Sequence, residues 1–264
     1  MSDGELLPDE SWSSRWLRWL LPLGLIALML LAWEIWVRVR DTPAWYLPAP
    51  SAVWSALLNN WASIRADAWV TLQEVVVGFG LAVLVAIPVA IAIERFLVIE
   101  RALYPIVVAT QAIPLVALAP LLLIWFGHGI MPKVVMVALI SFFPIVVSLV
   151  DGLRSADRET LDLLRTMGAS GWQRFRLVEV PSALPAFFSG AKIGMAVAVI
   201  GAVIGESSGS NAGLGHAISL YGASLKTPLV FACVLVLALM AIGLFAVIAL
   251  VERLAMPWRK WVVE

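Results

Sequence analysis

The chain has 264 residues, of which 62% are hydrophobic and 14% are charged, and its formal net charge is zero. Soluble domains contain about 45–50% apolar residues, so a mean hydropathy of +0.95 indicates that most of the chain contacts lipid. The balanced charge gives no indication of nucleic-acid binding. The single cysteine, Cys233, lies inside an apolar run, which excludes a disulfide within the chain and a thiolate metal cluster.

Six segments are apolar enough to span a bilayer, which takes about 20 residues. They lie near residues 20–37, 70–93, 103–126, 132–150, 183–205 and 228–251. The first segment lacks a small-residue cleavage site, so we expect a retained helix rather than a removed signal peptide. The predicted fold is an all-α integral membrane protein with six transmembrane helices.

Lysine and arginine are distributed unevenly between the two sets of loops, and they prefer the cytoplasmic side. With the N-terminus inside, twelve cationic residues fall on that side and five on the other, with Lys192 left uncounted. This predicts a membrane protein with both termini in the cytoplasm. The predicted organisation is a cytoplasmic tail (1–19), a first transmembrane helix (20–37), an outer segment (38–69), a transmembrane core (70–255) with a cytoplasmic loop (151–181), and a cytoplasmic tail (256–264).

A short amphipathic helix is predicted within the outer segment, with Ser51 as its cap. Trp54, Leu57, Leu58 and Trp61 recur at i, i+3, i+4 and i+7 and form one apolar stripe. Such a helix is expected to lie flat at the outer membrane interface. The stripe fits an anchor in the tryptophan belt or a contact surface for an outer binding protein, and both interpretations stay open.

The cytoplasmic loop carries the signals of a short helix. Asp157 and Glu159 lie where a first turn would be and Arg165 where a last turn would be, which suits the helix dipole at both ends. Gly168 follows where a left-handed C-cap is favoured. These features predict a helix near residues 156–167.

A second short helix is predicted directly after the first. Ser170-Gly171-Trp172-Gln173 fits the capping box, in which the glutamine side chain reaches back to the serine amide. We expect Pro181 and Pro185 to end this helix and to start the next span. Two short helices joined by a glycine hinge would form a compact knob.

The predicted knob exposes an apolar ridge made of Leu161, Leu164 and Met167. An exposed apolar ridge indicates a protein partner. The alternative is an ordinary loop whose leucines lie on the membrane surface, and spacing alone does not separate the two interpretations.

The loop also resembles a known motif. Its order of residues, Asp162-Leu163-Leu164-Arg165-Thr166-Met167-Gly168 followed by Val178-Glu179-Val180-Pro181, is similar to the "EAA" loop of ATP-binding-cassette (ABC) importer permeases. Further strings look like the nitrate/sulfonate/taurine branch of these permeases, namely Tyr46-Leu47-Pro48-Ala49-Pro50-Ser51, Val116-Ala117-Leu118-Ala119-Pro120, Trp125-Phe126-Gly127, Ser141-Phe142-Phe143-Pro144, Gly168-Ala169-Ser170 and Gly213-Leu214-Gly215. The resemblance extends over roughly residues 46–258 and implies the type I importer permease fold.

The resemblance implies that the loop contains a coupling helix that seats in a cleft of an ATPase. Asp162 and Gly168 match the acidic residue and the glycine that shape this helix. Asp162 replaces the usual glutamate and two leucines replace a pair of alanines, so a partner ATPase would need a groove roomy enough for leucine. The remaining coupling candidates are Glu159, Leu161, Leu164, Arg165, Met167, Ala169 and Trp172.

The same resemblance implies the partners. They are two copies of an ABC ATPase, a second permease copy, which makes a homodimer, and a periplasmic or lipid-anchored solute-binding protein. The chain contains no G-x-x-x-x-G-K-[ST] phosphate-binding string, so ATP and magnesium would be bound by the ATPase and no cofactor is expected in this chain. The chain is then a permease in the cell (inner) membrane and not an enzyme.

Ionisable residues within the spans are functional candidates because they are costly in a bilayer. Lys192 lies about two turns into the fifth span, where it could snorkel to the cytoplasmic face or line a pathway. Glu34 lies near the outer end of the first span and is expected at the interface. Glu206 opens a glycine-rich segment and is interpreted as a gate or ligand contact or, alternatively, as a solvated loop charge.

Polar and aromatic residues add further candidates for a translocation path. Thr110 and Gln111, followed by Pro114, supply hydrogen-bonding groups and a kink in the third span, although helix packing explains them equally well. Phe142 and Phe143 could stack on a flat solute or could simply pack in the core. The two histidines lie in different outer loops without further ligands at metal spacing, so no metal site is predicted.

The solute is predicted only by resemblance. Residues 116–127 and 196–215 look closest to permeases for thiamine pyrimidine precursors or riboflavin, while nitrate, taurine and alkanesulfonates remain open. An ion-coupled secondary transporter would be expected to show intramembrane acids or broken helices in paired halves. A membrane-embedded enzyme would need a catalytic cluster at bilayer depth, and no such arrangement is evident in the sequence.

Overall fold

The computed structural model describes residues 12–258, with side chains described from residue 20 onward; the ends of both predicted tails, 1–11 and 259–264, lie outside the described residues. Within that range the chain forms helices and connecting turns and contains no strand. The α-helices are α1 (Trp12–Val39), α2 (Pro50–Asn59), α3 (Trp61–Arg95), α4 (Leu97–Ala109), α5 (Leu115–Phe126), α6 (Met131–Arg154), α7 (Arg158–Thr166), α8 (Gly171–Arg174), α9 (Val180–Ser207), α10 (Leu214–Ala223) and α11 (Thr227–Ala255).

Six spans are present when one bent pair is counted as a single span, which confirms the predicted all-α membrane fold. The continuous candidates are Leu20–Val39, Trp61–Arg95, Met131–Arg154, Gly171–Ser207 and Thr227–Ala255. The second span begins at Trp61 rather than near residue 70, because polar Arg65 and Asp67 lower the local hydropathy without breaking the helix.

The third predicted span, 103–126, is not one helix. It consists of Leu97–Ala112 and Leu115–Phe126, which meet at an angle of 101°. Residues Thr110–Ala112 form a single 3-10 turn, and Pro114 precedes the first residue of α5. Proline disfavours a helical conformation in the residue before it, and Ile113 accordingly has the extended values φ −81° and ψ 122°. The predicted kink is therefore a complete break.

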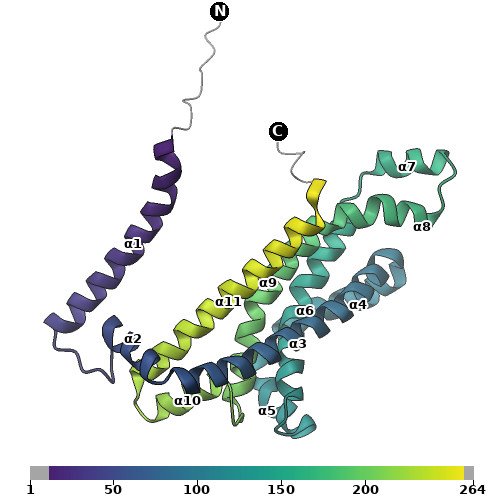
Figure 1. Cartoon of the computed structure of the whole chain (residues 1–264). Helices are drawn as coiled ribbons and strands as arrows, with labels where there is room; N and C mark the ends of the chain where they lie inside the picture. Colours follow the sequence, from purple (N-terminus) through teal and green to yellow (C-terminus); the bar gives the residue numbers. More distant parts are fainter. Residues whose placement is uncertain (1–11, 259–264) are drawn as a thin grey trace, which may run out of the picture.

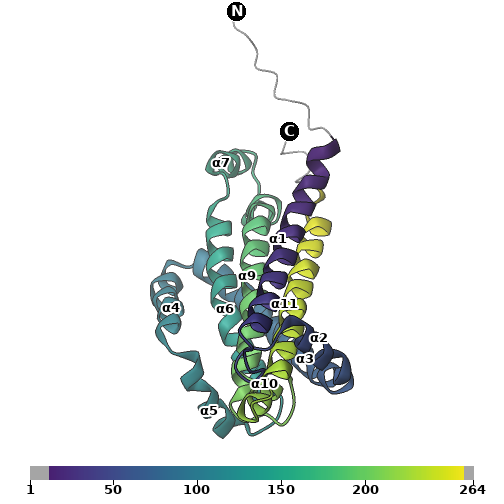
Figure 2. The same ribbon diagram turned by 90° about the vertical axis from the view of Figure 1, so that its left-hand side faces the viewer.

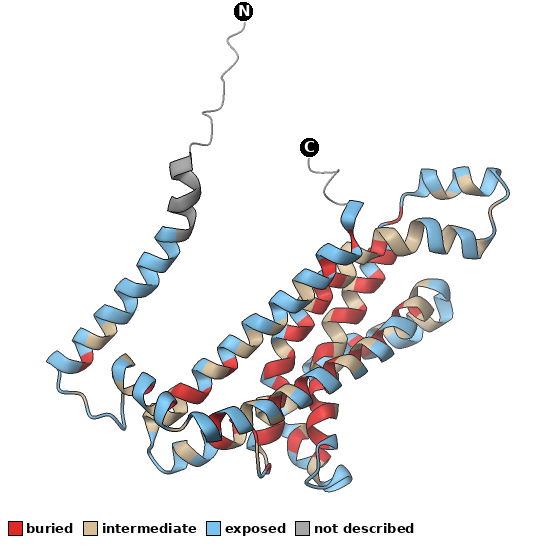
Figure 3. Cartoon of the chain, viewed as in Figure 1, coloured by how far each residue is buried: buried red, intermediate tan, exposed pale blue. Residues whose placement is uncertain are grey.

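The core is built around α6 and α9, which pack along their length and against α3 (Figures 1 and 3). Glycines allow these backbones to approach closely, as small residues do between membrane helices. A Cβ on Gly190 would lie 2.6 Å from the Pro144 carbonyl oxygen, and one on Gly78 would lie 2.6 Å from the Val137 side chain. Substitution at either position would separate the helices.

The first helix stands apart from this core (Figure 1). Its span Leu20–Val39 is almost entirely exposed. It meets the rest of the chain near its end, where the Trp33 and Phe231 rings lie 5.7 Å apart and the Glu34 carboxylate accepts hydrogen bonds from the amide and hydroxyl of Ser51, at 3.0 and 2.8 Å.

The molecule has two distinct ends (Figures 1 and 2). We call the end that carries α7 and α8 the loop end; the start of α1 and the end of α11 lie toward the same side. We call the opposite end, where α2 and α10 lie, the far end. The arrangement has the geometry expected from the predicted topology, while the side of the membrane that each end faces stays a prediction.

Candidate functional site

The first helix of the loop is α7, which begins after Asp157 and lies within the predicted range 156–167. The Asp157 carboxylate accepts hydrogen bonds from the amides of Glu159 and Thr160, at 3.3 and 3.0 Å, and from the Thr160 hydroxyl at 2.5 Å. The hydrogen bonds from the Thr160 hydroxyl and amide hold the pKa of Asp157 below its ordinary value. Asp157 is therefore the N-cap, one position earlier than the predicted first turn.

The hinge after α7 has the predicted left-handed conformation, with φ +80° at Gly168. The Gly168 amide donates to the Arg165 carbonyl at 3.0 Å, and the Ala169 amide donates to the Leu164 carbonyl at 2.9 Å. This pair of bonds is a Schellman motif, which satisfies carbonyl groups at the helix end. A Cβ on Gly168 would meet no heavy atom of the described residues within 4 Å, so the glycine is needed for its φ value and not for space.

The second helix starts at the predicted capping box. The Ser170 hydroxyl accepts a hydrogen bond from the Gln173 amide, and the Gln173 side chain accepts one from the Ser170 amide. The expected end of this helix at Pro181 was wrong, because the chain continues through a π-helical turn, Phe175–Glu179, directly into α9. Pro181 lies in the first turn of α9, just after the wide π turn, where its ring and missing amide are tolerated.

The loop exposes apolar side chains, although the predicted ridge was wrong in its members. Leu163, Met167 and Trp172 have exposed fractions of 60%, 73% and 66%. Leu161 and Leu164 are instead half-buried, whereas Met167 is exposed as predicted. We call Leu163, Met167 and Trp172 the loop patch.

The other predicted coupling residues lie around this patch. Asp162 is exposed and pairs with Arg165 at 2.9 Å within the same helix. Glu159 is exposed in the first turn of α7, and Ala169 is half-buried next to the hinge. The structure therefore brings the predicted coupling residues together on one short helical unit, while their role stays a prediction.

Charged side chains connect the base of the loop to the core. Arg95, at the end of α3, lies 3.7 Å from Glu179 and places its guanidinium 5.5 Å from the centre of the Phe175 ring. Arg154, at the end of α6, pairs with Glu100 of α4 at 2.7 Å. These contacts join the loop base to the end of α3 and the end of α6 to α4.

A second cluster of polar groups lies at the far end and centres on Glu206, which is completely buried. Its carboxylate accepts hydrogen bonds from the Thr71 hydroxyl at 2.6 Å and from the Gly215 amide at 2.5 Å. The interpretation of Glu206 as a solvated loop charge was wrong, because the glycine-rich segment folds back over the side chain. Its interpretation as a gate or ligand contact stays a prediction.

Two members of this cluster, Glu74 and Lys133, were not predicted from the sequence. Both are buried, and the Lys133 ammonium lies 3.7 Å from the Glu74 carboxylate. A lone acid within the apolar run of the second span was the available signal for Glu74. Lys133 lies at the start of the fourth predicted span and is one of the five cations that the sequence places on the outer side.

The remaining path candidates do not gather at one site. Lys192 pairs with Glu252 of α11 at 2.7 Å, and it lies about 21 Å from Glu206 along α9, at roughly 1.5 Å per residue; its anchoring and pathway roles both stay predictions. The Thr110 hydroxyl donates to the Val107 carbonyl at 2.6 Å, and Gln111 is exposed at the break between α4 and α5.

The two phenylalanines of α6 and the two histidines likewise form no shared site. Phe142 and Phe143 are half-buried and pack against the core, which favours simple packing. His128 is exposed in the loop after α5, and His216 is half-buried in α10. Within residues 12–258 no group of three or more histidine, cysteine, aspartate or glutamate side chains is arranged to hold a metal ion.

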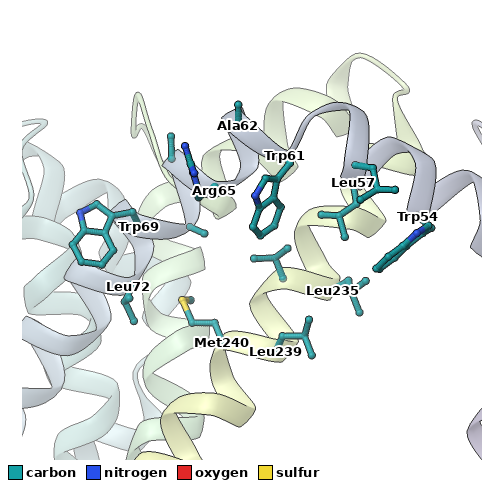
Figure 4. Close-up of a pocket in the computed structure, with 14 residues that line it drawn as sticks. Trp54, Leu57, Trp61, Ala62, Arg65, Trp69, Leu72, Leu235, Leu239 and Met240 are labelled. Carbon is teal, nitrogen blue, oxygen red and sulfur yellow. The ribbon is translucent and has the colours of Figure 1, made fainter.

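The predicted outer helix lines a large apolar groove with α3 and α11 (Figure 4). The groove has a volume of about 980 Å³, and all four residues of the predicted stripe line it, although Trp61 begins α3 and does not belong to the predicted helix, α2. Among the described residues that line the groove, Arg65 is the only charged one. Ser51 is not the helix cap, because Ala49 occupies that position and Pro50 the first helical one.

Comparison with known families gives one match that covers most of the core. Residues 78–257 match the family described as binding-protein-dependent transport system inner membrane component. The matched range includes the loop, its hinge and the far-end segment around Glu206.

Among individual proteins, the chain is 37% identical to the formylaminopyrimidine transport permease protein ThiX of Halalkalibacterium halodurans, over 90% of this chain and 96% of that protein. It is 38% identical to the riboflavin transport system permease protein RibX of Chloroflexus aurantiacus, over 90% and 89% of the two chains. Identity to the taurine transport system permease protein TauC of Escherichia coli is 29%, over 96% and 98%.

Solved structures agree on the fold. The inward-facing MetNI methionine ABC transporter contains a chain that matches with a TM-score of 0.57 and 20% identity, over 71% of this chain and 96% of that one. An amino acid ABC transporter with histidines matches with a TM-score of 0.57 and 16% identity, over 75% and 94%.

Proposed function

Since this chain belongs to the family of binding-protein-dependent transport system inner membrane components, it is the permease subunit of an ABC importer, and we propose that it moves a small heterocyclic solute into the cell by alternating access. The observation that carries the proposal is the match of residues 78–257, which includes an exposed helical loop with a left-handed glycine hinge. The proposal has three parts: orientation, coupling and solute.

In the proposed orientation the loop end faces the cytoplasm and the far end faces the outside of the cell (inner) membrane. The excess of lysine and arginine on the loop side supports this orientation. Both termini would then be cytoplasmic, and α2 with its tryptophan stripe would lie at the outer interface, where tryptophan is enriched. Fusion of a reporter that is active on only one side of the membrane, placed after Ser170, tests this assignment.

In the proposed mechanism the loop patch seats in a groove of a separate ABC ATPase, and Asp162 and Gly168 shape the contact. Closure of two ATPase subunits on ATP and magnesium would move two such loops, one from each of two permease copies. The ionic contacts of Arg95 and Arg154 would pass the movement to α3, α4 and α6. The helices would then rock between inward-facing and outward-facing states.

The proposed solute is a neutral heterocycle such as a thiamine pyrimidine precursor or riboflavin. Two of the more similar relatives are named for formylaminopyrimidine and riboflavin, at 37% and 38% identity. Relatives named for taurine and for aliphatic sulfonates are less similar, at 29% and 28%, so these solutes, together with nitrate, are the second candidates.

The identity of the solute is tested most directly on the solute-binding protein, because that partner would deliver the solute to the permease. The binding protein that co-purifies with the permease is screened by thermal shift against formylaminopyrimidine, riboflavin, taurine and an alkanesulfonate. A stabilisation by either heterocycle supports the proposal, and by mass action it amounts to about 2.7 kcal/mol at a ligand concentration of 100 times Kd. Stabilisation by taurine or the sulfonate alone would replace it with the second candidate.

A further inference from the structure

Three ionisable side chains from three helices meet at the far end. Glu74 of α3, Lys133 of α6 and Glu206 of α9 have exposed fractions of 1%, 6% and 0%. Two acids and one base would leave one negative charge in a buried region when all three are ionised. Burial of an uncompensated charge is very costly, so such groups are paired or neutralised.

Glu206 has the hydrogen bonds of an ionised carboxylate. One oxygen accepts from the Thr71 hydroxyl at 2.6 Å and the other from the Gly215 amide at 2.5 Å. Gly215 is the second residue of α10, so the acid sits at a helix N-terminus, where negative charge is favoured. The Thr71 hydroxyl in turn accepts from the Leu214 amide at 2.9 Å, and Asp67 accepts from the Gly213 amide at 3.1 Å.

The glycines of this segment are explained by the same carboxylate. A Cβ on Gly213 would overlap the Glu206 carboxyl group, and Gly213 has φ +105°. A Cβ on Gly215 would lie 2.7 Å from the Val203 carbonyl oxygen and 2.8 Å from Glu206. The backbone thus wraps closely around one side chain, and α10 is fastened to α3 and α9 through it.

Glu74 has a different set of partners. One of its oxygens faces Lys133, whereas the other is buried and receives no hydrogen bond from an N–H or O–H donor of the described residues. The carboxyl groups of Glu74 and Glu206 lie close enough to interact. Adjacent carboxylates do not both ionise, and a proton on the unpartnered Glu74 oxygen would turn that oxygen into a hydrogen-bond donor.

We propose that Glu74 and Glu206 form a buried proton-binding site, with the proton on Glu74, and that the bound proton holds α10 against the core. Glu206 is the acceptor because both of its oxygens already accept hydrogen bonds. With this proton, Lys133 balances the single remaining negative charge of the three. Loss of the proton would place two carboxylates side by side and would weaken the attachment of α10.

Other titratable groups lie on the elements packed around the pair. They are Arg65, Asp67, Glu94 and Arg95 on α3, Lys133, Asp151 and Arg154 on α6, Lys192 on α9, His216 and Tyr221 on α10, and Cys233, Glu252 and Arg253 on α11, while α5 contains no titratable side chain. Of these, Lys133 is the group that pairs with Glu74, and the Asp67 carboxylate already accepts a hydrogen bond from the Gly213 amide. The site is thus assigned to the two glutamates.

The experiment uses the full chain in lipid nanodiscs, and the proton itself is the probe. Infrared difference spectra are recorded across pH with Glu74→Gln, Glu206→Gln and the control Glu100→Gln, which alters an acid of the loop end paired with Arg154. We expect a protonated-carboxyl band in the wild type that persists in the control and is absent from Glu74→Gln. A wild type without such a band, or a band that Glu74→Gln leaves in place, would overturn the proposal.

Thermal unfolding supplies a second readout that needs no transport assay and so does not depend on the proposed function. The bound proton stabilises the folded chain, so the stabilisation is present at lower pH and is lost as the pH rises past proton release. Glu74→Gln supplies an amide donor in place of the proton, and its unfolding temperature should lose this pH dependence, while the control keeps it.

Glu206→Gln should be far more harmful than Glu74→Gln, because its amide group places a donor against the Thr71 hydroxyl or the Gly215 amide. We expect about a tenfold lower ratio of folded to unfolded protein, which equals ~1.4 kcal/mol. Equal effects of the two substitutions would contradict the assignment of the proton. If Glu206→Gln gives no folded protein, the comparison of the protonated-carboxyl band between the wild type and Glu74→Gln still tests whether Glu74 carries the proton.

Discussion

The two ends of the helical core hold their glycine-containing segments in opposite ways. At the loop end, Gly168 turns the chain in the open, and the caps of α7 and α8 come from Asp157 and Ser170 of the same segment. At the far end, Gly213 and Gly215 close around a buried carboxylate that belongs to a different helix.

This difference predicts how each end behaves. A segment with local caps and few buried contacts keeps its own shape but can move as a unit, because little core packing is lost when it shifts. A segment fastened by buried, charge-assisted hydrogen bonds is expensive to release. The loop end is therefore suited to meet a moving partner, and the far end is suited to fix α10 on the core.

The largest expected effect comes from Gly213→Ala at the far end. The new Cβ would overlap Glu206 in a residue with φ +105°, so backbone strain of about 1–2 kcal/mol adds to a broken buried hydrogen bond of about 1–3 kcal/mol. We expect most of the folded protein to be lost, as measured by the yield of monodisperse protein and its unfolding temperature. The control is Gly222→Ala in α10. A Cβ there would meet no heavy atom of the described residues within 4 Å, so this substitution should be tolerated.

A second substitution removes the hinge at the loop end without disturbing the core. Gly168→Val places a β-branched residue at φ +80°, which strains the hinge by about 1–2 kcal/mol. The strain stays within the exposed loop, so we expect normal membrane insertion and little change in the unfolding temperature of the helical core, with stimulation of the partner ATPase lowered by about tenfold.

The matched control for the hinge is Gly168→Asn, because asparagine tolerates the left-handed conformation. Asparagine should keep most of the ATPase stimulation, measured with the same purified complex. Similar losses for valine and asparagine would indicate that the hinge conformation is not what couples the loop to the ATPase.

A third test separates binding from stability within the loop. Asp162 and Arg165 pair at 2.9 Å with side-chain exposures of 68% and 64%, and such surface pairs contribute only about 0.2–1 kcal/mol. Asp162→Lys should therefore leave the unfolding temperature unchanged but reduce the amount of ATPase that co-purifies. The double change Asp162→Arg with Arg165→Asp restores the internal pair; if it also restores ATPase recovery, the acid is needed only for the helix and not for the partner.

The same contrast explains what the sequence predicted well. The α7 helix, the left-handed Gly168 and the capping box of Ser170 and Gln173 were predicted because each depends on residues three or four positions apart. The six spans were predicted because a bilayer imposes their length and composition. In both cases the controlling interactions are local, so they are visible in a short window of sequence.

The far end could not be predicted in this way, because its interactions join distant residues. Thr71 and Glu206 are 135 positions apart, and no local rule pairs them. Lys133 was counted among the outer cations because it lies at the start of a predicted span, whereas tertiary packing buries it against Glu74. Pro181 was expected to end a helix. The π turn at Phe175–Glu179 lets the helix continue past this proline, and no sequence signal predicts that turn.

The smallest expected effect concerns the cap of α7 and its dependence on pH. The hydrogen bonds from Thr160 keep the pKa of Asp157 below the ordinary value of 3.8, so the cap is fully present above that pH and is lost as the pH falls through the lower folded value. Amide hydrogen exchange at Glu159 and Thr160 should therefore be slow near neutral pH relative to the unprotected rate and should lose protection in acid.

Asp157→Asn keeps a capping oxygen that does not titrate, so the protection of these two amides should vary less with pH. Asp157→Ala should remove their protection at every pH. Equal pH dependence of protection in the aspartate and asparagine chains would mean that α7 is held by contacts other than its own cap, which would remove the contrast with the far end.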